Sequence, residues 1–196
     1  GGEGIGANGE ELGAVVERGV ADASCGQPSA DTAALVEHRH VAAGRGKFAG
    51  GWDKLREETF ARQKQMGVIP ADAKLTPRPK EIPAWDAMTA NQKRLFEVQM
   101  ETFAGFAEHT DHEVGRLVAQ LEALGELDNT IFFYIVGDNG ASAEGGPEGT
   151  YNEMMALNGI VGKAEQMMNH IKAWGDTTTF PQLAIRWAWA GKTPFQ

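Results

Sequence analysis

Cysteine and basic residues are scarce in this sequence. Cys25 is the single cysteine among 196 residues, which excludes an intramolecular disulfide framework. Only 18 lysines and arginines stand against 27 aspartates and glutamates, so the formal net charge is −9. A negatively charged protein is repelled by phosphate backbones and by anionic membrane surfaces. Neither nucleic acid nor a membrane is therefore expected as a partner.

Long apolar runs are absent as well. No stretch approaches the roughly 20 apolar residues that span a bilayer. The first residues do not combine a basic region with an apolar segment, as a secretory signal peptide would. The compartment therefore stays undetermined. The length is sufficient for one hydrophobic core, and a single domain is the default expectation.

Residues 1–45 are rich in glycine, alanine and glutamate and show little hydrophobic periodicity. Such a segment buries too little apolar surface to offset its chain entropy, which predicts poor order. Its GIGANG stretch, residues 4–9, matches the G-x-G-x-x-G dinucleotide fingerprint. Only three residues precede it, so no strand can lead into the turn that the fingerprint requires. The sequence predicts a poorly ordered part, 1–45, and a folded part, 46–196.

Two helices are predicted in the folded part. Asp53 is a candidate N-cap for a first helix, and Gly67 is the residue that ends it. Thr89 and Gln92 form a capping-box signature at the start of a long second helix, which ends at Gly125. One face of the second helix is mostly apolar, and its residues recur at spacings of three, four and seven, as in an amphipathic helix: Phe96, Phe103, Ala107, Thr110, Val114, Leu117, Leu121 and Leu124.

A run of six apolar residues, 131–136, follows the long helix. A run without polar alternation predicts a strand buried on both faces, as in a parallel sheet covered by helices. Asp138 and Asn139 come directly after it, in the sequence GDNG. Open α/β sheets bind ligands beyond the carboxyl ends of their strands, and calcium prefers carboxylate and amide oxygens. Asn-Gly is also common in plain turns, so the tetrapeptide alone leaves both interpretations open.

The longer string YIVGDNGASAEGG, followed by GTYNEM, resembles the central strand and loop of the arylsulfatase family. The similarity extends over residues 46–196. It implies an α/β fold: an incomplete part of a sulfatase, alkaline-phosphatase-like domain with a mostly parallel central sheet flanked by helices. By the same resemblance, Asp138 and Asn139 are metal ligands that hold a calcium ion (Ca2+) beside the sulfate ester.

No catalytic residue is predicted. Arylsulfatases carry C-x-P-S-R, whose cysteine or serine becomes the formylglycine nucleophile. The sequence CGQPSA has one residue too many before its proline, and Ala30 replaces the arginine. Cys25 is therefore expected to be an ordinary thiol. His38 and His40 lie near the place of a family histidine segment but lack its Ala-Pro, and a solvated surface pair is expected instead.

Other polar and sulfur-bearing residues are explained more simply by exposure or packing than by a metal or ligand site. His109, Asp111 and His112 are predicted to lie on the solvent-exposed side of the long helix rather than to form a metal cluster. Gln182 stands where relatives often have histidine, so no contact is inferred there. Four methionines favour adaptable core or a surface that faces a partner: Met154, Met155, Met167 and Met168.

The resemblance implies an arylsulfatase-like sulfuric ester hydrolase, which hydrolyses a small-molecule aryl sulfate ester to phenol and sulfate with the help of calcium. Because the nucleophile is missing, the chain alone is expected to be an inactive fragment. Truncation or a shifted reading frame around residues 40–46 would explain that loss. The alternative is a non-catalytic remnant or binding module that uses the apolar surface left by missing strands.

Overall fold

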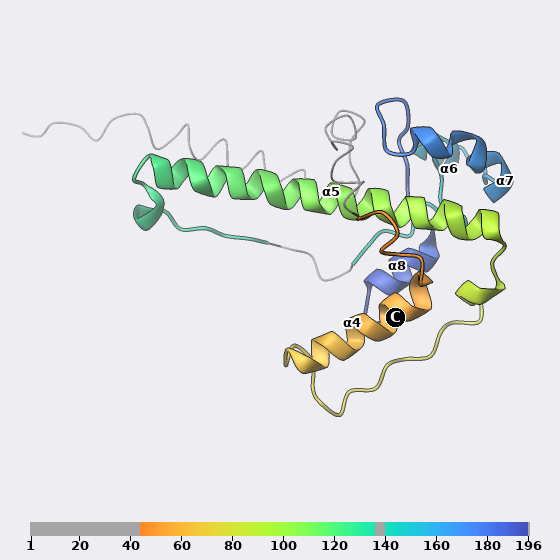
Figure 1. The fold of residues 1–196 in the computed structure, drawn as a ribbon, viewed down its shortest axis with the longest axis horizontal. Helices are drawn as coiled ribbons and strands as arrows, with labels where there is room; N and C mark the ends of the chain where they lie inside the picture. The colour runs from red at the N-terminus through yellow and green to blue at the C-terminus, as the bar shows by residue number, and fades with distance from the viewer. Residues whose placement is uncertain (1–43, 136–139, 196) are drawn as a thin grey trace, which may run out of the picture.

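The structure is a computed structural model that describes residues 44–135 and 140–195. It contains five α-helices and three short 3₁₀ helices within those residues: α4 (Gly51–Gln65), η1 (Trp85–Ala87), α5 (Ala90–Ala123), η2 (Leu127–Asn129), α6 (Glu153–Leu157), α7 (Ala164–Met167), η3 (Met168–Ala173) and α8 (Ile185–Gly191). Figure 1 shows α5 as the long axis, with α4 and α8 on one side and α6 and α7 on the other. Of the helices in these ranges, none is long and apolar enough to cross a membrane.

Helix α4 starts two residues before Asp53, so the predicted N-cap is wrong. The Asp53 carboxylate instead accepts hydrogen bonds from the Trp85 backbone N–H at 2.9 Å and from the Arg78 guanidinium at 2.6 Å. It therefore ties α4 to the connection that leads into α5. The predicted end of α4 is confirmed, because the N–H of Gly67 donates to the Lys64 carbonyl in a closing turn.

The long helix α5 begins and ends as predicted. The Gln92 N–H donates to the Thr89 hydroxyl at 3.3 Å, and the Thr89 N–H donates to the Gln92 side chain at 3.0 Å. This reciprocal capping box satisfies two of the orphan donors of the first turn. At the other end, the Gly125 N–H donates to the Glu122 carbonyl. The local sequence alone is sufficient to set both ends.

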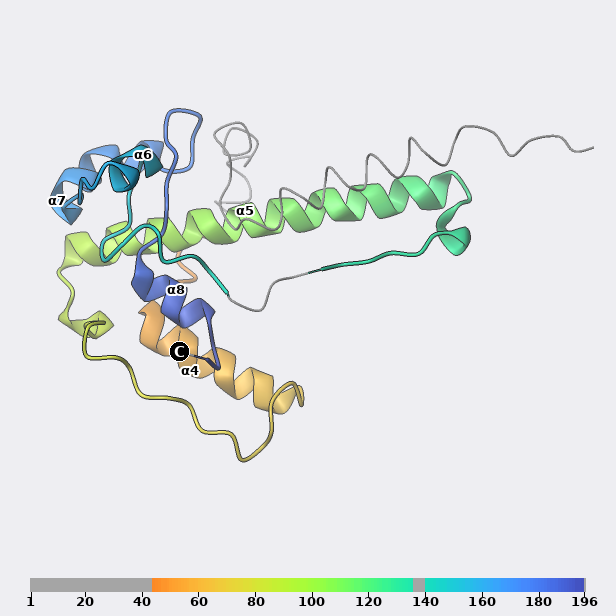
Figure 2. The ribbon, with the colours of Figure 1, turned by 180° about the vertical axis from the view of Figure 1, so that it is seen from behind.

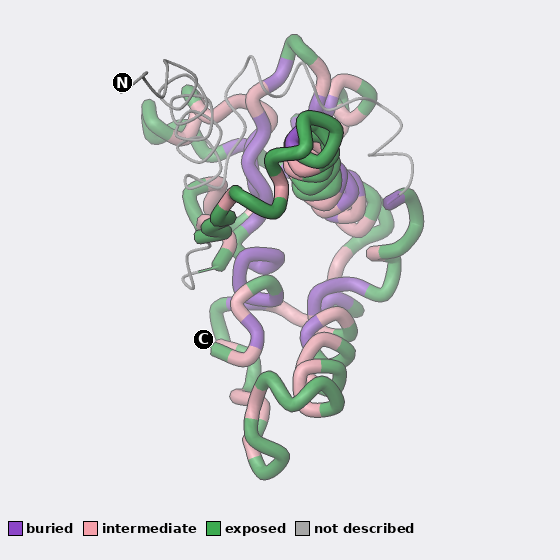
Figure 3. Tube along the Cα trace, turned by 90° about the vertical axis from the view of Figure 1, so that its left-hand side faces the viewer, coloured by how far each residue is buried: buried purple, intermediate pink, exposed green. Residues whose placement is uncertain are grey.

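Tryptophans join α4, η1 and α8 to the first half of α5. Trp52, fully buried, meets Trp85, Phe96 and Trp187 edge to face, with ring centroids 4.7, 5.4 and 5.7 Å apart. Such pairs add to the stabilisation from burial alone. A second cluster covers the neighbouring face of α5 and consists of Leu95, Val98, Ala164, Met167 and Trp174. The core therefore packs on the N-terminal half of α5. Figure 3 shows the buried segments in purple.

The predicted buried strand is not formed. Residues 131–135 have no strand assignment and are all exposed, while Val136 lies outside the described residues. Figure 2 shows them as an extended connection that runs back from the far end of α5. The described ranges contain only two isolated bridges, Thr150 with Gln182 and Asn152 with Phe180. A strand needs a neighbouring strand to pair its backbone, and no described segment pairs with residues 131–135. The parallel sheet is therefore absent from these ranges.

Candidate functional site

The predicted metal ligands Asp138 and Asn139 lie outside the described residues, as do Cys25, His38 and His40. The structure describes the chain on both sides of the two ligands, up to Ile135 and from Gly140 onward. The following geometry concerns the downstream flank, residues 140–150.

Gly140, the first residue of this flank, packs against the end of α8. It has a φ of +71°, and a Cβ built there would lie 2.7 Å from Cγ of Lys192. Glycine adopts this conformation without a steric penalty and leaves room for the lysine. Lys192 is the C-cap of α8, and the Cβ of Ala141 is close to Gly191 in the same turn. The residue next to Asn139 in the chain is therefore packed against the end of α8.

The flank then closes against α5 and the segment before α8. Gly149 has a φ of +76°, and an added Cβ would lie 2.6 Å from Nε2 of Gln99 and 2.8 Å from the carbonyl of Gln182. Thr150 and Gln182 exchange two backbone hydrogen bonds at 3.0 and 2.8 Å. Glycine at position 149 allows three segments to meet closely at this point.

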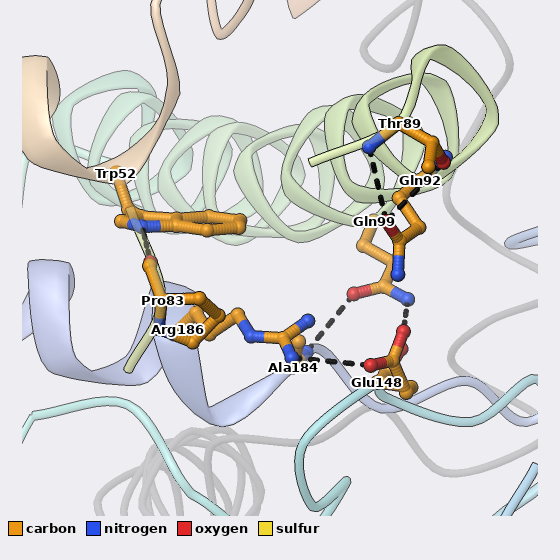
Figure 4. A network of polar contacts seen from close by, with 8 residues as sticks. All are labelled: Trp52, Pro83, Thr89, Gln92, Gln99, Glu148, Ala184 and Arg186. Atoms are coloured by element: carbon orange, nitrogen blue, oxygen red, sulfur yellow. Dashed lines mark hydrogen bonds and ion pairs between the residues drawn. The ribbon is translucent and has the colours of Figure 1, made fainter. Parts of the chain in front are cut away.

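The amide of Gln99 links these segments. Its Nε2 donates to the carbonyl of Glu148 at 2.7 Å, and its Oε1 accepts from the N–H of Ala184 at 3.0 Å (Figure 4). Gln99 is only 1% exposed. Both ends of a buried amide are therefore satisfied by backbone groups of two different segments, which fixes the distance between them.

A partly buried ion pair adds a second link between these segments. Arg186 Nη2 lies 3.1 Å from Glu148 Oε1, and its guanidinium sits 4.9 Å from the ring of Phe96 and 5.7 Å from that of Trp52. Figure 4 shows the arginine below Trp52 with its head toward Glu148. Glu148 Oε2 and Arg186 Nη1 have no hydrogen-bond partner. The pair is thus partly satisfied and depends on both partners being present.

Arg56 on α4 holds the residues that follow α8. Its guanidinium donates to the Trp189 carbonyl and the Thr193 hydroxyl, both at 3.2 Å, and to the Phe195 carbonyl at 2.9 Å. It is 1% exposed, and burial lowers the pKa of Arg56 below its usual value. Since Lys192 lies within this segment, Arg56 also fixes the surface on which Gly140 packs.

Gln182 is buried at this junction, and its Oε1 has no hydrogen-bond partner. His109, Asp111 and His112 lie on the far half of α5. Across the described ranges, no three His, Cys, Asp or Glu side chains are grouped so that they could hold a metal.

The carboxylate of Asp138 and the amide oxygen of Asn139 suit calcium, but they supply only two or three of its six to eight ligands. The donor set fits part of a calcium shell.

Sequence reasoning missed Gln99, Glu148, Arg186 and Arg56. Two of them carry a signal in the sequence. Gln99 lies three residues after Phe96 and four before Phe103, on the apolar stripe itself, where a polar residue needs a buried partner. Arg186 is the single charge in the apolar stretch LAIRWAWA, which indicates a paired or stacked cation.

Comparison with known proteins gives the chain's relatives. The Sulfatase family model matches residues 39–185. An uncharacterised sulfatase of Schizosaccharomyces pombe is 31% identical over 153 residues, which is 76% of this chain and 26% of that protein. An arylsulfatase of Klebsiella aerogenes is 28% identical over 98 residues, 50% of this chain and 21% of that protein. The chain thus spans about a quarter of the length of the curated relatives it matches.

Proposed function

Since this chain belongs to the sulfatase family, we propose that it forms part of a sulfuric ester hydrolase that acts on aryl sulfates. The observation that carries the proposal is the family match over residues 39–185, which includes the Asp-Asn loop. The family implies an alkaline-phosphatase-like fold for the complete domain. The aryl preference is supported by the similarity to the arylsulfatase of Klebsiella aerogenes.

Asp138 and Asn139 would hold a calcium ion through their side-chain oxygens. When bound, the ion would supply positive charge that orients and partly neutralises the sulfate oxygens. The described residues would position the loop. Gln99 and Arg186 fasten its downstream end at Glu148. Such support around ligand residues is what keeps a site in its productive geometry.

The chain by itself would not turn over substrate. Its single cysteine stands in CGQPSA rather than C-x-P-S-R, so no residue is placed to become formylglycine. Residues 1–45 would be a poorly ordered part, and 46–196 would be the partial catalytic domain. We expect the purified chain to leave 4-nitrophenyl sulfate intact.

The test is hydrolysis by the longest natural protein that contains this sequence. We expect release of 4-nitrophenol from the sulfate ester and much less from the phosphate ester. Asp138→Ala and Asn139→Ala should each abolish the release. Asp128→Ala is the matched control, because Asp128 is an exposed carboxylate upstream of the loop. Full activity in Asp138→Ala, or activity on the phosphate ester alone, would contradict the proposal.

A second candidate function is a non-catalytic binding module. One observation favours it: residues 131–135 expose five consecutive large apolar side chains. Exposed contiguous apolar surface marks interaction sites. The same hydrolysis assay separates the two candidates, because a binding module would show no Asp138-dependent release from any natural form of the protein.

A further inference from the structure

Arg56 binds the chain on both sides of Lys192. Its Nη1 donates to the Trp189 carbonyl and to the Thr193 hydroxyl, both at 3.2 Å. Lys192 lies between these two acceptors in the sequence, and its own N–H donates to the Trp189 carbonyl at 3.3 Å. The Thr193 hydroxyl also donates to the Ala190 carbonyl at 2.6 Å. The last turn of α8 is therefore closed around Lys192 and fastened to α4 through one guanidinium.

Further polar contacts from α4 hold the residues that follow this turn. Arg56 Nη2 donates to the Phe195 carbonyl at 2.9 Å, and Gln63 Nε2 donates to the Thr193 carbonyl at 2.8 Å. Figures 1 and 2 both show α8 beside α4. The position of the end of α8 is therefore set by these side chains in addition to the tryptophans that pack between the two helices.

Packing alone does not account for an arginine at position 56. Its guanidinium carbon lies 4.5 Å from the centroid of the Trp189 ring, which an apolar side chain could also cover. Arg56 is 1% exposed, and its acceptors are neutral carbonyl and hydroxyl oxygens. Burying a cation against neutral acceptors costs free energy. What arginine adds over an apolar residue is a rigid fork of donors, which fixes the orientation of several acceptors at once.

The turn around Lys192 is also the surface that Gly140 touches. A Cβ added to Gly140 would lie 2.7 Å from Cγ and 3.4 Å from Cα of Lys192. The second of these atoms belongs to the backbone, so the contact follows the turn itself and not only a flexible side chain. Gly140 is bonded to Asn139 in the chain. A shift of the last turn of α8 would therefore move the support of the residue that follows Asn139.

We propose that Arg56 is a positioning residue for the metal loop, because it fixes the turn that supports Gly140 and so restricts the direction from which Asn139 approaches a calcium ion. This inference rests on the proposed function, in which Asp138 and Asn139 are the metal ligands. Losing a partner that orients a metal ligand costs roughly 10–100-fold in metal affinity. Arg56 acts through one intervening turn, so we expect an effect at the lower end of that range.

The first experiment is calcium titration by calorimetry, with the longest natural protein that contains this sequence. Arg56→Met removes the donors and keeps an apolar stem over Trp189. It should weaken calcium binding about tenfold. Arg56→Lys keeps the charge and some of the donors, so its affinity should fall between that of Arg56→Met and that of the unmodified protein.

A matched variant separates positioning from loss of stability. Met167, on α7, is 1% exposed and belongs to the second hydrophobic cluster, away from α4 and α8. Urea unfolding identifies which of Met167→Ala, Met167→Val and Met167→Leu is destabilised to the same degree as Arg56→Met. That variant should change the calcium affinity by less than about twofold, since distant sites act independently.

The second experiment needs no metal. Amide ¹H–¹⁵N spectra of the 196-residue chain, recorded with a chelator, follow the signals of Gly140 and Ala141. Arg56→Met should shift both signals, because the turn on which these residues pack is released. The matched Met167 variant should leave them in place. Arg62→Met, which changes an exposed arginine of the same helix, should alter neither these signals nor the affinity.

Two results would overturn the proposal. The first is an equal loss of calcium affinity in Arg56→Met and in the matched Met167 variant, because Arg56 would then act only through stability. The second is that the Gly140 and Ala141 signals do not move in Arg56→Met. No calcium binding by the unmodified protein would instead contradict the proposed function, and the two amide signals would then decide alone whether Arg56 positions the loop.

Discussion

The two halves of α5 differ in what covers them. The first half lies between two hydrophobic clusters, and its buried residues run from Leu95 to Gly105. Beyond Gly105, Leu121 is the single buried residue of α5. Figure 3 is viewed from the C-terminal end of α5, which is exposed at the front, and the buried turn of α8 lies below it. Residues 131–135, which follow that end, are exposed throughout.

The contrast shows what a helix and a strand each need. A helix pairs its backbone within itself, so α5 forms along its whole length although only one half is packed. A strand must find a neighbour, and residues 131–135 have none among the described residues. Apolar residues are therefore part of a regular element in α5 and of an exposed, extended segment at residues 131–135.

The largest expected difference between the two regions is in stability. Trp187→Ala removes a fully buried ring from the first cluster and should cost about 3–5 kcal/mol. Phe133→Ala removes an exposed ring and should change the free energy of unfolding by less than about 0.5 kcal/mol. Urea unfolding of both variants measures the difference. Similar costs would show that residues 131–135 are packed in solution.

Loss of the Arg56 guanidinium should lower the free energy of unfolding by almost as much. Arg56→Met removes the buried hydrogen bonds from the guanidinium to the Trp189 carbonyl and the Thr193 hydroxyl, together with the bond to the Phe195 carbonyl, and should cost about 2–3 kcal/mol. Arg62→Met, on an exposed turn of the same helix, is the control and should be nearly neutral. The measurement is again the midpoint of urea unfolding. Equal effects for the two arginines would mean that the segment after α8 is not held by Arg56.

A smaller difference between the packed and the open region is expected in the coupling energies of two ion pairs. Glu148 and Arg186 pair in the packed region, with side chains 20% and 9% exposed, whereas Glu113 and Arg116 pair on the open half of α5. A double-mutant cycle with Glu148→Gln and Arg186→Met should give a coupling of about 1–2 kcal/mol. The cycle with Glu113→Gln and Arg116→Met should give less than about 0.5 kcal/mol. Equal couplings would contradict the burial of the first pair.

Local chemistry made α5 and the end of α4 predictable. Thr89 and Gln92 cap α5 through contacts within four residues, which a sequence displays directly. Gln99 and Arg186 act across 85 and 38 residues of chain, respectively. The sequence analysis missed both, and the only signal for them was a polar residue in an apolar setting. The strand prediction failed because burial depends on a neighbour that the local pattern does not specify. The two metal ligands lie outside the described residues and stay predictions.

Calcium titration by calorimetry tests the central claim, that the Asp-Asn loop is a sulfatase metal site. The 196-residue chain supplies few ligands, so we expect weak binding with a Kd of about 1 mM or higher, lost in Asp138→Ala and kept in Asp128→Ala. The longest natural protein that contains the chain should bind at least a hundredfold more tightly, with the same dependence on Asp138. Tight binding by the short chain that survives Asp138→Ala would place the site elsewhere and contradict the account.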